Sequence, residues 1–338
     1  MKRLLVRRGA VGLTLGALAA TGLASVPVPA HAVVADPEVG VRVHSDSGYY
    51  NDVDDWVYCE EAGVVDLDDV VPWSDNGVPV SRSGSTAGTY TDPANTADKV
   101  NVNASGSASV SSTPFTGSTS TTITGTAQAT VSAISQGATT NCDTDIRAES
   151  GASGEITLTQ PMWVTLTAAG DGTGTGMMVL VNADGVSQIV TAKRGTASSG
   201  TLLSAGEAYF QFASMAEANA DGADEETRSY SATFKIELKP VGTATEPTGK
   251  GKGYAQFGAR DCATGNVAAA ITKKAKKKAK QVVITVNGAK VAKFKGKKLK
   301  KRTLVLPAAP AAAAEVVATI TLKNGKKVTV TRSYLACS

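Results

Sequence analysis

Aromatic residues, histidine and cysteine are scarce in this chain of 338 residues. Aromatic side chains make up 5% of it, and there are only two histidines and four cysteines. His44 is the single histidine beyond residue 32, so a Ser-His-Asp or Cys-His system would depend on it alone. The motifs Gly-x-Ser-x-Gly and His-Glu-x-x-His are absent. The sequence therefore predicts a non-catalytic protein; a carboxylate-pair glycosidase stays open, because its two acids need not be close in the chain.

Long apolar runs are also missing, apart from one near the start. The run over residues 9–24 is shorter than the ~20 residues that a membrane helix needs. Basic residues precede it, and Ala30-His31-Ala32 follows, which completes the three parts of an export signal. We expect a signal peptide over residues 1–32, cleaved after Ala32, with a retained anchor as the alternative. No transmembrane segment is expected in the mature chain, which we predict to be secreted or extracellular and associated with the cell wall.

The formal charge divides sharply between two parts of the mature chain. Residues 33–249 hold 9 Lys and Arg against 28 Asp and Glu, whereas residues 250–338 hold 21 against two, Asp261 and Glu315. The composition changes at the same place, in a stretch rich in Gly, Pro and Thr. We therefore predict an acidic domain over 33–240, a linker over 241–253 and a basic domain over 254–338.

The cysteines divide in the same way, two on each side of the predicted linker. Pairing Cys59 with Cys142 and Cys262 with Cys337 is the simplest of three connectivities. Each bridge would close a loop of about 80 residues and contribute on the order of 4 kcal/mol in the chain-entropy model.

Alternation of small apolar and polar residues dominates the acidic part. The pattern is clearest over 123–133 and returns over 156–166 and 232–238, which predicts strands with one buried face. Asn182-Ala183-Asp184-Gly185 predicts a hairpin. Residues 83–120, rich in Ser, Thr and Gly, fit small-residue strands, a long loop or a glycosylated stalk.

Two segments of this part resemble a known kind of fold. Gly154-Glu-Ile-Thr-Leu-Thr-Gln-Pro-Met-Trp-Val-Thr-Leu and Leu202-Leu-Ser-Ala-Gly-Glu-Ala-Tyr-Phe-Gln-Phe-Ala are similar to strands of the jelly-roll β-sandwiches of bacterial secreted proteins. The resemblance implies a jelly-roll-like antiparallel sandwich. It implies no ligand, since some relatives of this kind bind glycans and many have none known.

The basic part predicts a second, smaller sandwich. Strands are expected near 254–257, 281–286, 290–295, 303–306, 316–322 and 327–334, with type I′ turns at Asn287-Gly288 and Asn324-Gly325. With Cys262 near its start and Cys337 near its end, it resembles the disulfide-closed immunoglobulin-like modules of actinobacterial secreted proteins. The fold class expected for the whole chain is all-β, two antiparallel sandwiches after a signal peptide. Residues 268–280 could alternatively form a helix, because Ala and Lys favour one.

The chemistry of the basic part lies in its lysines. A domain with so many like charges is destabilised by repulsion, so we expect a polyanion to neutralise it. Lys in place of Arg favours diffuse, salt-sensitive attraction. The few aromatics of this part, Tyr254, Phe257, Phe294 and Tyr334, are expected in the core or at strand edges. The alternative is a solubilising surface. The predicted polyanion-binding residues are Lys273, Lys274, Lys276, Lys277, Lys278, Lys280, Lys293, Lys295, Lys297, Lys298, Lys300, Lys301 and Arg302, with Lys323, Lys326 and Lys327 as a third cluster.

Two weaker patterns lie in the acidic part. Asp52, Asp54 and Asp55 offer the oxygen ligands that calcium prefers, so a structural calcium is one interpretation and an exposed acidic loop the other. No other cofactor is expected. Trp163 is out of phase with Met162 and Val164 and is predicted to point outward, as a candidate glycan contact.

These patterns predict a non-catalytic secreted or envelope-associated protein whose basic module binds an anionic wall or matrix polymer by charge. The alternative is a secreted glycan-binding or glycan-active protein that uses the first sandwich. A third interpretation is docking of the acidic and basic domains, within one chain or between chains.

Overall fold

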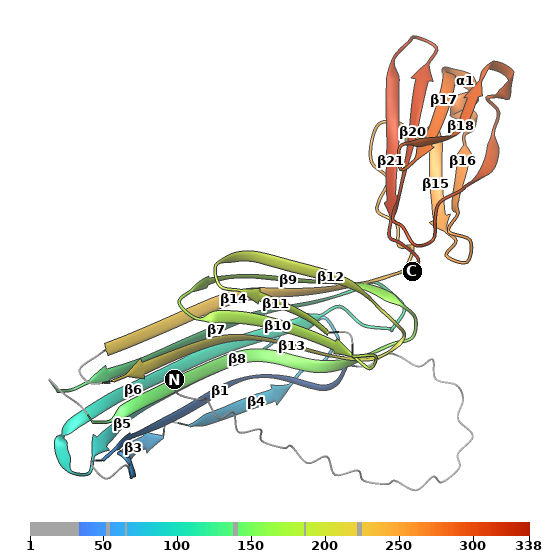
Figure 1. The fold of residues 1–338 in the computed structure, drawn as a ribbon. Coiled ribbons are helices and arrows are strands. Elements are labelled where there is room, and N and C mark those ends of the chain that lie inside the picture. Colours follow the sequence, from blue (N-terminus) through green and yellow to red (C-terminus); the bar gives the residue numbers. More distant parts are fainter. Residues whose placement is uncertain (1–33, 52–54, 65, 138–140, 186, 222–224) are drawn as a thin grey trace, which may run out of the picture. The chain divides into compact units, whose positions relative to one another are not determined.

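The chain folds into four antiparallel β-sheets, which confirms the all-β sandwich class (Figure 1). The computed structural model describes residues 34–51, 55–64, 66–137, 141–185, 187–221 and 225–338. The predicted signal peptide, residues 1–32, lies outside these ranges. Within them, no helix has the length and hydropathy that crossing a membrane would require.

Two seven-stranded sheets form the first sandwich, residues 34–240. Its strands are β1 (Val34–Tyr50), β2 (Trp56–Tyr58), β3 (Glu60–Val64), β4 (Leu67–Pro72), β5 (Val80–Asp92), β6 (Asn95–Ser112), β7 (Thr121–Ser135), β8 (Asp143–Leu158), β9 (Met162–Gly172), β10 (Thr175–Asn182), β11 (Ser187–Ala192), β12 (Gly195–Leu203), β13 (Gly206–Ala220) and β14 (Glu225–Pro240).

The strands β7 to β14 form a jelly roll. They are ordered β12-β9-β14-β7 in one sheet and β11-β10-β13-β8 in the other. Consecutive strands alternate between the sheets, except that β10 and β11 form the hairpin predicted around Asp184. This is the order of an eight-stranded jelly roll built from two Greek keys, so the predicted architecture is confirmed.

The strands before residue 113 widen both sheets of the jelly roll. β1, with β2 and β4, continues the sheet of β8, while β6, β5 and β3 continue the sheet of β7. The segment 83–120 is therefore two strands as far as Ser112, joined by a turn at residues 93–94, and 113–120 is a connection. Val102 and Val110 are fully buried between smaller neighbours, which gives this polar-looking segment a core face.

Close approach of aromatic rings to glycine joins the two sheets. Phe212 of β13 lies so near Gly125 of β7 that a Cβ there would be 2.0 Å from the ring. Phe212 also stacks on Phe234, with ring centroids 4.8 Å apart. Because cores are close-packed, a missing Cβ on one sheet makes room for a large side chain from the other.

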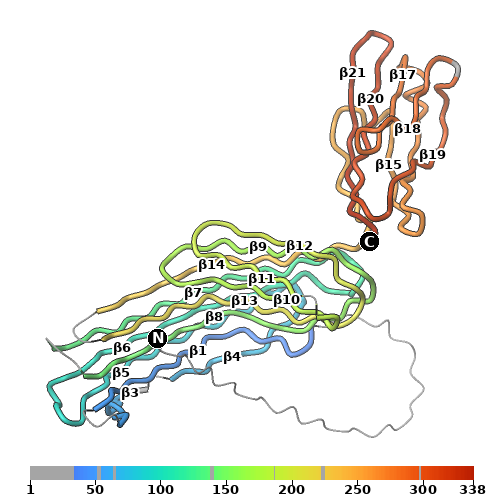
Figure 2. The backbone as a smooth tube through the Cα atoms, viewed as in Figure 1, coloured from blue at the N-terminus to red at the C-terminus, as the bar shows by residue number. Residues whose placement is uncertain are grey.

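The second pair of sheets forms the C-terminal sandwich, whose strands lie in residues 255–334. Its elements are β15 (Ala255–Arg260), β16 (Val267–Ile271), α1 (Lys273–Lys278), β17 (Ala279–Val286), β18 (Ala289–Lys295), the 3-10 helix η1 (Gly296–Lys298), β19 (Arg302–Leu306), β20 (Ala314–Leu322) and β21 (Lys327–Tyr334). The sheets are ordered β15-β16-β19 and β18-β17-β20-β21. Figure 2 labels the four strands of the second sheet together with β15 and β19. Three strands against four in this order is an immunoglobulin-like arrangement, as expected.

The cysteines pair as the simplest connectivity predicts. Cys59 is bonded to Cys142, and Cys262 to Cys337. In the C-terminal sandwich the bridge joins the connection after β15 to the residues after β21, and Tyr254, Phe257, Phe294 and Tyr334 are buried as expected. Disulfides indicate an oxidising, extracellular type of environment.

Residues 244–251, within the predicted linker, lie against β21. Backbone N–H groups of Thr245, Thr248 and Gly251 donate to carbonyl oxygens of Ser333, Thr331 and Thr329 over 2.7–2.9 Å. The polar composition suggested a loop. The backbone N–H groups of this segment nevertheless bond carbonyl oxygens of β21 that would otherwise accept hydrogen bonds from water.

Two local expectations differ in detail from the structure. Asn287 and Gly288 both have positive φ, as a type I′ turn requires, but at the second turn only Gly325 does. That hairpin has a longer loop, closed by Leu322 N–H to the Lys326 carbonyl. The helical alternative for 268–280 is correct only over α1, because alternate residues up to Ile271 are buried in the core as β16.

Candidate polyanion-binding site

The first lysine cluster is held outward by one short helix. Thr272 caps α1, since its Oγ1 accepts from the Ala275 backbone N–H at 3.3 Å. Ala275 is the one buried residue of the helix, and the five lysines around it are exposed. A small buried residue in a run of lysines therefore leaves the lysine side chains exposed, although Lys274 Nζ also lies 5.0 Å from the centre of the Tyr254 ring.

The other two clusters meet α1 at the same end of the sandwich. The backbone N–H of Lys323, in the β20–β21 hairpin, donates to the Lys278 carbonyl at 2.9 Å. On the opposite side of β17, Lys295 pairs with Gln281. In Figure 1 this end carries α1 and lies away from the C-terminus. We call it the lysine end, and its exposed members are Lys273, Lys274, Lys276, Lys277, Lys278, Lys280, Lys295, Lys298, Lys300, Lys301, Lys323, Lys326 and Lys327.

Three predicted residues stand somewhat apart from this set. Lys293 is exposed two residues further along β18, beside Val283. The side chain of Lys297 lies outside the described part of the structure. Arg302 is half-buried with its guanidinium 4.7 Å from the centre of the Phe294 ring, so packing explains this arginine at least as well as ligand binding.

Both acids of the C-terminal sandwich lie at its other end. Asp261 is bonded within the turn beside Cys262, where it accepts from Thr264 Oγ1 at 2.8 Å. Glu315 is next to the Asn287 turn, and its backbone N–H donates to Asn287 Oδ1 at 2.7 Å. Among the described residues, no lysine of this sandwich forms an ion pair. The positive charge is therefore concentrated and uncompensated.

The arginines away from the lysine end have structural partners. Arg260 is buried and donates to the carbonyl oxygens of Gly265, Leu335 and Ala309. Burial lowers the pKa of its guanidinium, which stays a cation because arginine is effectively always protonated. Arg332 donates to the Thr245 carbonyl at 2.8 Å. The fold thus uses arginine to bind its own carbonyls and leaves lysine exposed.

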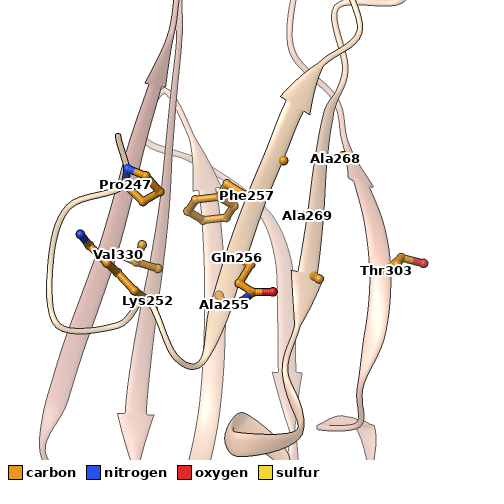
Figure 3. Close-up of a pocket in the computed structure, with 11 residues that line it drawn as sticks. Pro247, Lys252, Ala255, Gln256, Phe257, Ala268, Ala269, Thr303 and Val330 are labelled. Carbon is orange, nitrogen blue, oxygen red and sulfur yellow. The ribbon is translucent and has the colours of Figure 1, made fainter. Parts of the chain in front are cut away.

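A cavity of about 570 Å³ lies over the β15-β16-β19 sheet (Figure 3). Small side chains such as Ala268, Ala270 and Thr303 line it, with Lys252 as the one charged lining residue. No carboxylate, histidine or cysteine is among the lining residues, so Lys252 is the one titratable side chain that lines the cavity.

The outer face of the β8 sheet carries a charged grid that sequence reasoning missed. Arg42 pairs with Glu149, His44 with Arg147 and Asp46 with Asp145 across β1 and β8. Desolvation, then the neighbouring charges of Glu217 and Asp46, raise the pKa of Asp145 to about 6. Alternation in the sequence could have shown that these charged residues share the outer face of each strand. It could not show which residue of β1 lies beside which residue of β8, because register depends on long-range pairing.

The two weaker predictions have different outcomes. Asp52 and Asp54 lie outside the described residues, and Asp55 is exposed with its backbone N–H bonded to Asn51. The described residues contain no group of three metal-ligating side chains, so calcium binding there stays a prediction. Trp163 is half-buried, unlike its buried neighbours, and its Nε1–H donates to the Ala336 carbonyl at 3.0 Å. A glycan contact at Trp163 stays a prediction.

Comparison with known proteins identifies no family. No known protein family and no curated protein matches the chain. Among solved structures, a GH2 β-galacturonidase from Eisenbergiella tayi is 9% identical with a TM-score of 0.17, over 54% of this chain and 34% of that one. The adhesin domain of Epf from Streptococcus pyogenes is 8% identical with a TM-score of 0.18, over 75% and 89%. The chain spans about a third of the galacturonidase's length, and similarity this low carries no functional argument.

Proposed function

We propose that this is a secreted, non-catalytic protein that the lysine end holds to an anionic cell-wall or matrix polymer. One observation carries the proposal: three lysine clusters from distant parts of the chain meet at one end of the C-terminal sandwich, without acidic partners among the described residues. Both acids of that sandwich lie at the other end. A solubilising surface needs no such segregation.

The residue types favour a repeating polymer over a discrete anion. Lysine ammonium groups are strongly hydrated point charges on flexible stems, and they lack the planar fork with which arginine binds phosphate or carboxylate in two-point fashion. Attraction of this kind depends on the number of charges that meet and on counterion release, so it weakens steeply with salt. A long polyanion with many charges suits such a surface.

Co-sedimentation of the mature protein with purified cell walls tests the proposal. The walls are used before and after their anionic polymers are stripped, over a salt series from about 0.05 to 0.5 M. We expect salt-sensitive binding that is lost on stripping. A triple variant, Lys323→Gln, Lys326→Gln and Lys327→Gln, should bind less and show a shallower salt slope.

The matched control is Lys99→Gln, Lys193→Gln and Lys290→Gln, three exposed lysines away from the lysine end. It removes the same net charge and should bind nearly as the parent does. Equal losses in both triple variants would mean that net charge alone matters and would contradict the proposal. If the protein self-associates at low salt, dissociates at high salt and does not bind walls, the polyanion that the lysine end binds would instead be the acidic sandwich.

A further inference from the structure

The β1–β2 hairpin carries three exposed aromatic side chains on one face. Tyr50, Trp56 and Tyr58 are 69%, 41% and 73% exposed, in a chain with few aromatics. Tyr50 pairs directly with Trp56, and Tyr58 pairs with Gly48. Since residues i and i+2 share a face, the three rings form one group, which we call the aromatic hairpin.

The rings contact one another in a fixed arrangement. The centroids of Tyr50 and Trp56 are 5.0 Å apart at 70°, and those of Trp56 and Tyr58 are 6.1 Å apart at 83°. The indole covers Gly48, where a Cβ would lie 2.6 Å from two of its ring atoms. The indole therefore packs on the strand with a tyrosine against it on each side, and a large part of each ring stays open to water.

Two contacts hold the aromatic hairpin in place, one on the opposite face of the sheet and one at the end of β2. Tyr49 points to the opposite face, and its hydroxyl donates to Asp92 at 3.0 Å. Cys59, directly after Tyr58, is bonded to Cys142. Because these anchors hold the rings before any ligand arrives, binding there loses less conformational entropy.

The surroundings of the aromatic hairpin select the ligand. Asp143 pairs with Gly48, and Asp46 with Asp145, so exposed carboxylates continue the same face of the sheet. Carboxylate oxygens accept hydrogen bonds from hydroxyl groups and repel anions. A protein partner would need roughly 800 Å² on its side, far more than three rings expose. Exposed aromatic rings beside hydrogen-bonding carboxylates instead suit a neutral ligand that presents both apolar faces and hydroxyl groups.

We propose that the aromatic hairpin binds a neutral polysaccharide, whose pyranose C–H faces stack on the rings while its hydroxyls donate to the neighbouring carboxylates. This site is separate from the lysine end and from Trp163. The first sandwich would then bind a neutral ligand, whereas the lysine end binds a polyanion. Binding at the aromatic hairpin would neutralise no charge.

Titration of the mature protein with neutral hexasaccharides tests this proposal. The probes are β-1,4-linked oligomers of glucose, of N-acetylglucosamine and of xylose, at low salt and at about 0.5 M salt. We expect at least one probe to bind with an affinity that salt leaves unchanged. Trp56→Ala should weaken that binding by about tenfold or more, and Tyr50→Ala or Tyr58→Ala by less, because each removes one stacking face.

Tyr209→Ala is the matched control, because Tyr209 is a 39%-exposed aromatic residue on β13 of the same sheet. It should bind as the parent does, and Trp56→Phe should retain part of the affinity. Absence of binding to all three probes overturns the proposal, as does equal weakening by Trp56→Ala and Tyr209→Ala. Either outcome leaves the lysine end unaffected, since its binding is read with walls and by its salt slope.

Discussion

The two sandwiches handle charge in opposite ways. In the first, most of the described cations form ion pairs, Lys99 and Lys193 being the exceptions: Arg42 bonds to Glu38 and Asp68, and Lys235 pairs with Glu237. In the C-terminal sandwich, the described lysines form no ion pair, and most of them, though not Lys290, gather at one end. Surface ion pairs contribute little to stability. The main effect of the ion pairs in the first sandwich is therefore to reduce the electrostatic field around its cations. The unpaired lysines of the second create a field, which acts at a distance on polyanions.

Loss of the C-terminal disulfide should change the relative stability of the two sandwiches more than any other variant considered. Cys262→Ser with Cys337→Ser opens a loop with a sequence separation of 75, which costs about 4 kcal/mol in the chain-entropy model. Domain stabilities are about 5–15 kcal/mol, so the smaller sandwich should unfold at a much lower temperature. Calorimetry and limited proteolysis under oxidising conditions measure this.

The control is Cys59→Ser with Cys142→Ser, whose separation of 83 gives nearly the same entropic cost. It should destabilise the first sandwich and leave wall binding intact, whereas the C-terminal double variant should lose both. Unchanged proteolysis of residues 241–338 in the C-terminal variant would show that the bridge is dispensable there.

A smaller effect is expected from filling a glycine site in the first sandwich. Gly125→Ala places a Cβ against the Phe212 ring, and overpacking of this kind costs about 1–3 kcal/mol. Gly258→Ala is the counterpart on the C-terminal sandwich, where the nearest atom is 3.2 Å away, on the outer face. Chemical denaturation should show a clear loss only for Gly125→Ala, with partial rescue by Phe212→Leu. A neutral Gly125→Ala would mean that the sheets can separate without cost.

The alternation of apolar and polar residues made many of the strands predictable. Features that depend on pairing between distant segments could not be predicted from the sequence. The period-two pattern of residues 123–133 placed β7 correctly, because alternate Ile, Gly and Ala residues face the core. Residues 83–112 showed little contrast between apolar and polar positions, so three interpretations stayed open. The lysine clusters were visible one by one, but their convergence depends on contacts such as Lys323 with Lys278. The aromatic hairpin was missed because only the register of β1 and β2 brings Tyr50 to Trp56.

Added salt should stabilise the C-terminal sandwich by up to about 1 kcal/mol. On α1, Lys273 and Lys277, and Lys274 and Lys278, are like-charge pairs four residues apart, each destabilising by about 0.2–0.5 kcal/mol. Screening at about 0.5 M salt removes most of that repulsion. Sodium chloride should therefore raise the thermal midpoint of this sandwich more than that of the first. Equal shifts for both would mean that the lysines do not repel one another measurably.

The smallest expected effect is a pH dependence in the first sandwich, through Asp145. Its pKa is raised to about 6, above the value of an unfolded aspartate, so the folded state binds more protons between about pH 4 and 6. Stability from this group is thus present at the acidic side and is lost as pH rises through 6. Asp145→Asn should leave stability near pH 4 unchanged and increase it slightly at pH 7.5, by an amount that solvent screening keeps small because the side chain is exposed. Urea denaturation at the two pH values measures the difference, with Asp171→Asn, an exposed aspartate on β9, as the control. A loss of stability at pH 7.5 in Asp145→Asn would show that the folded state stabilises Asp145 as the carboxylate and would contradict the prediction.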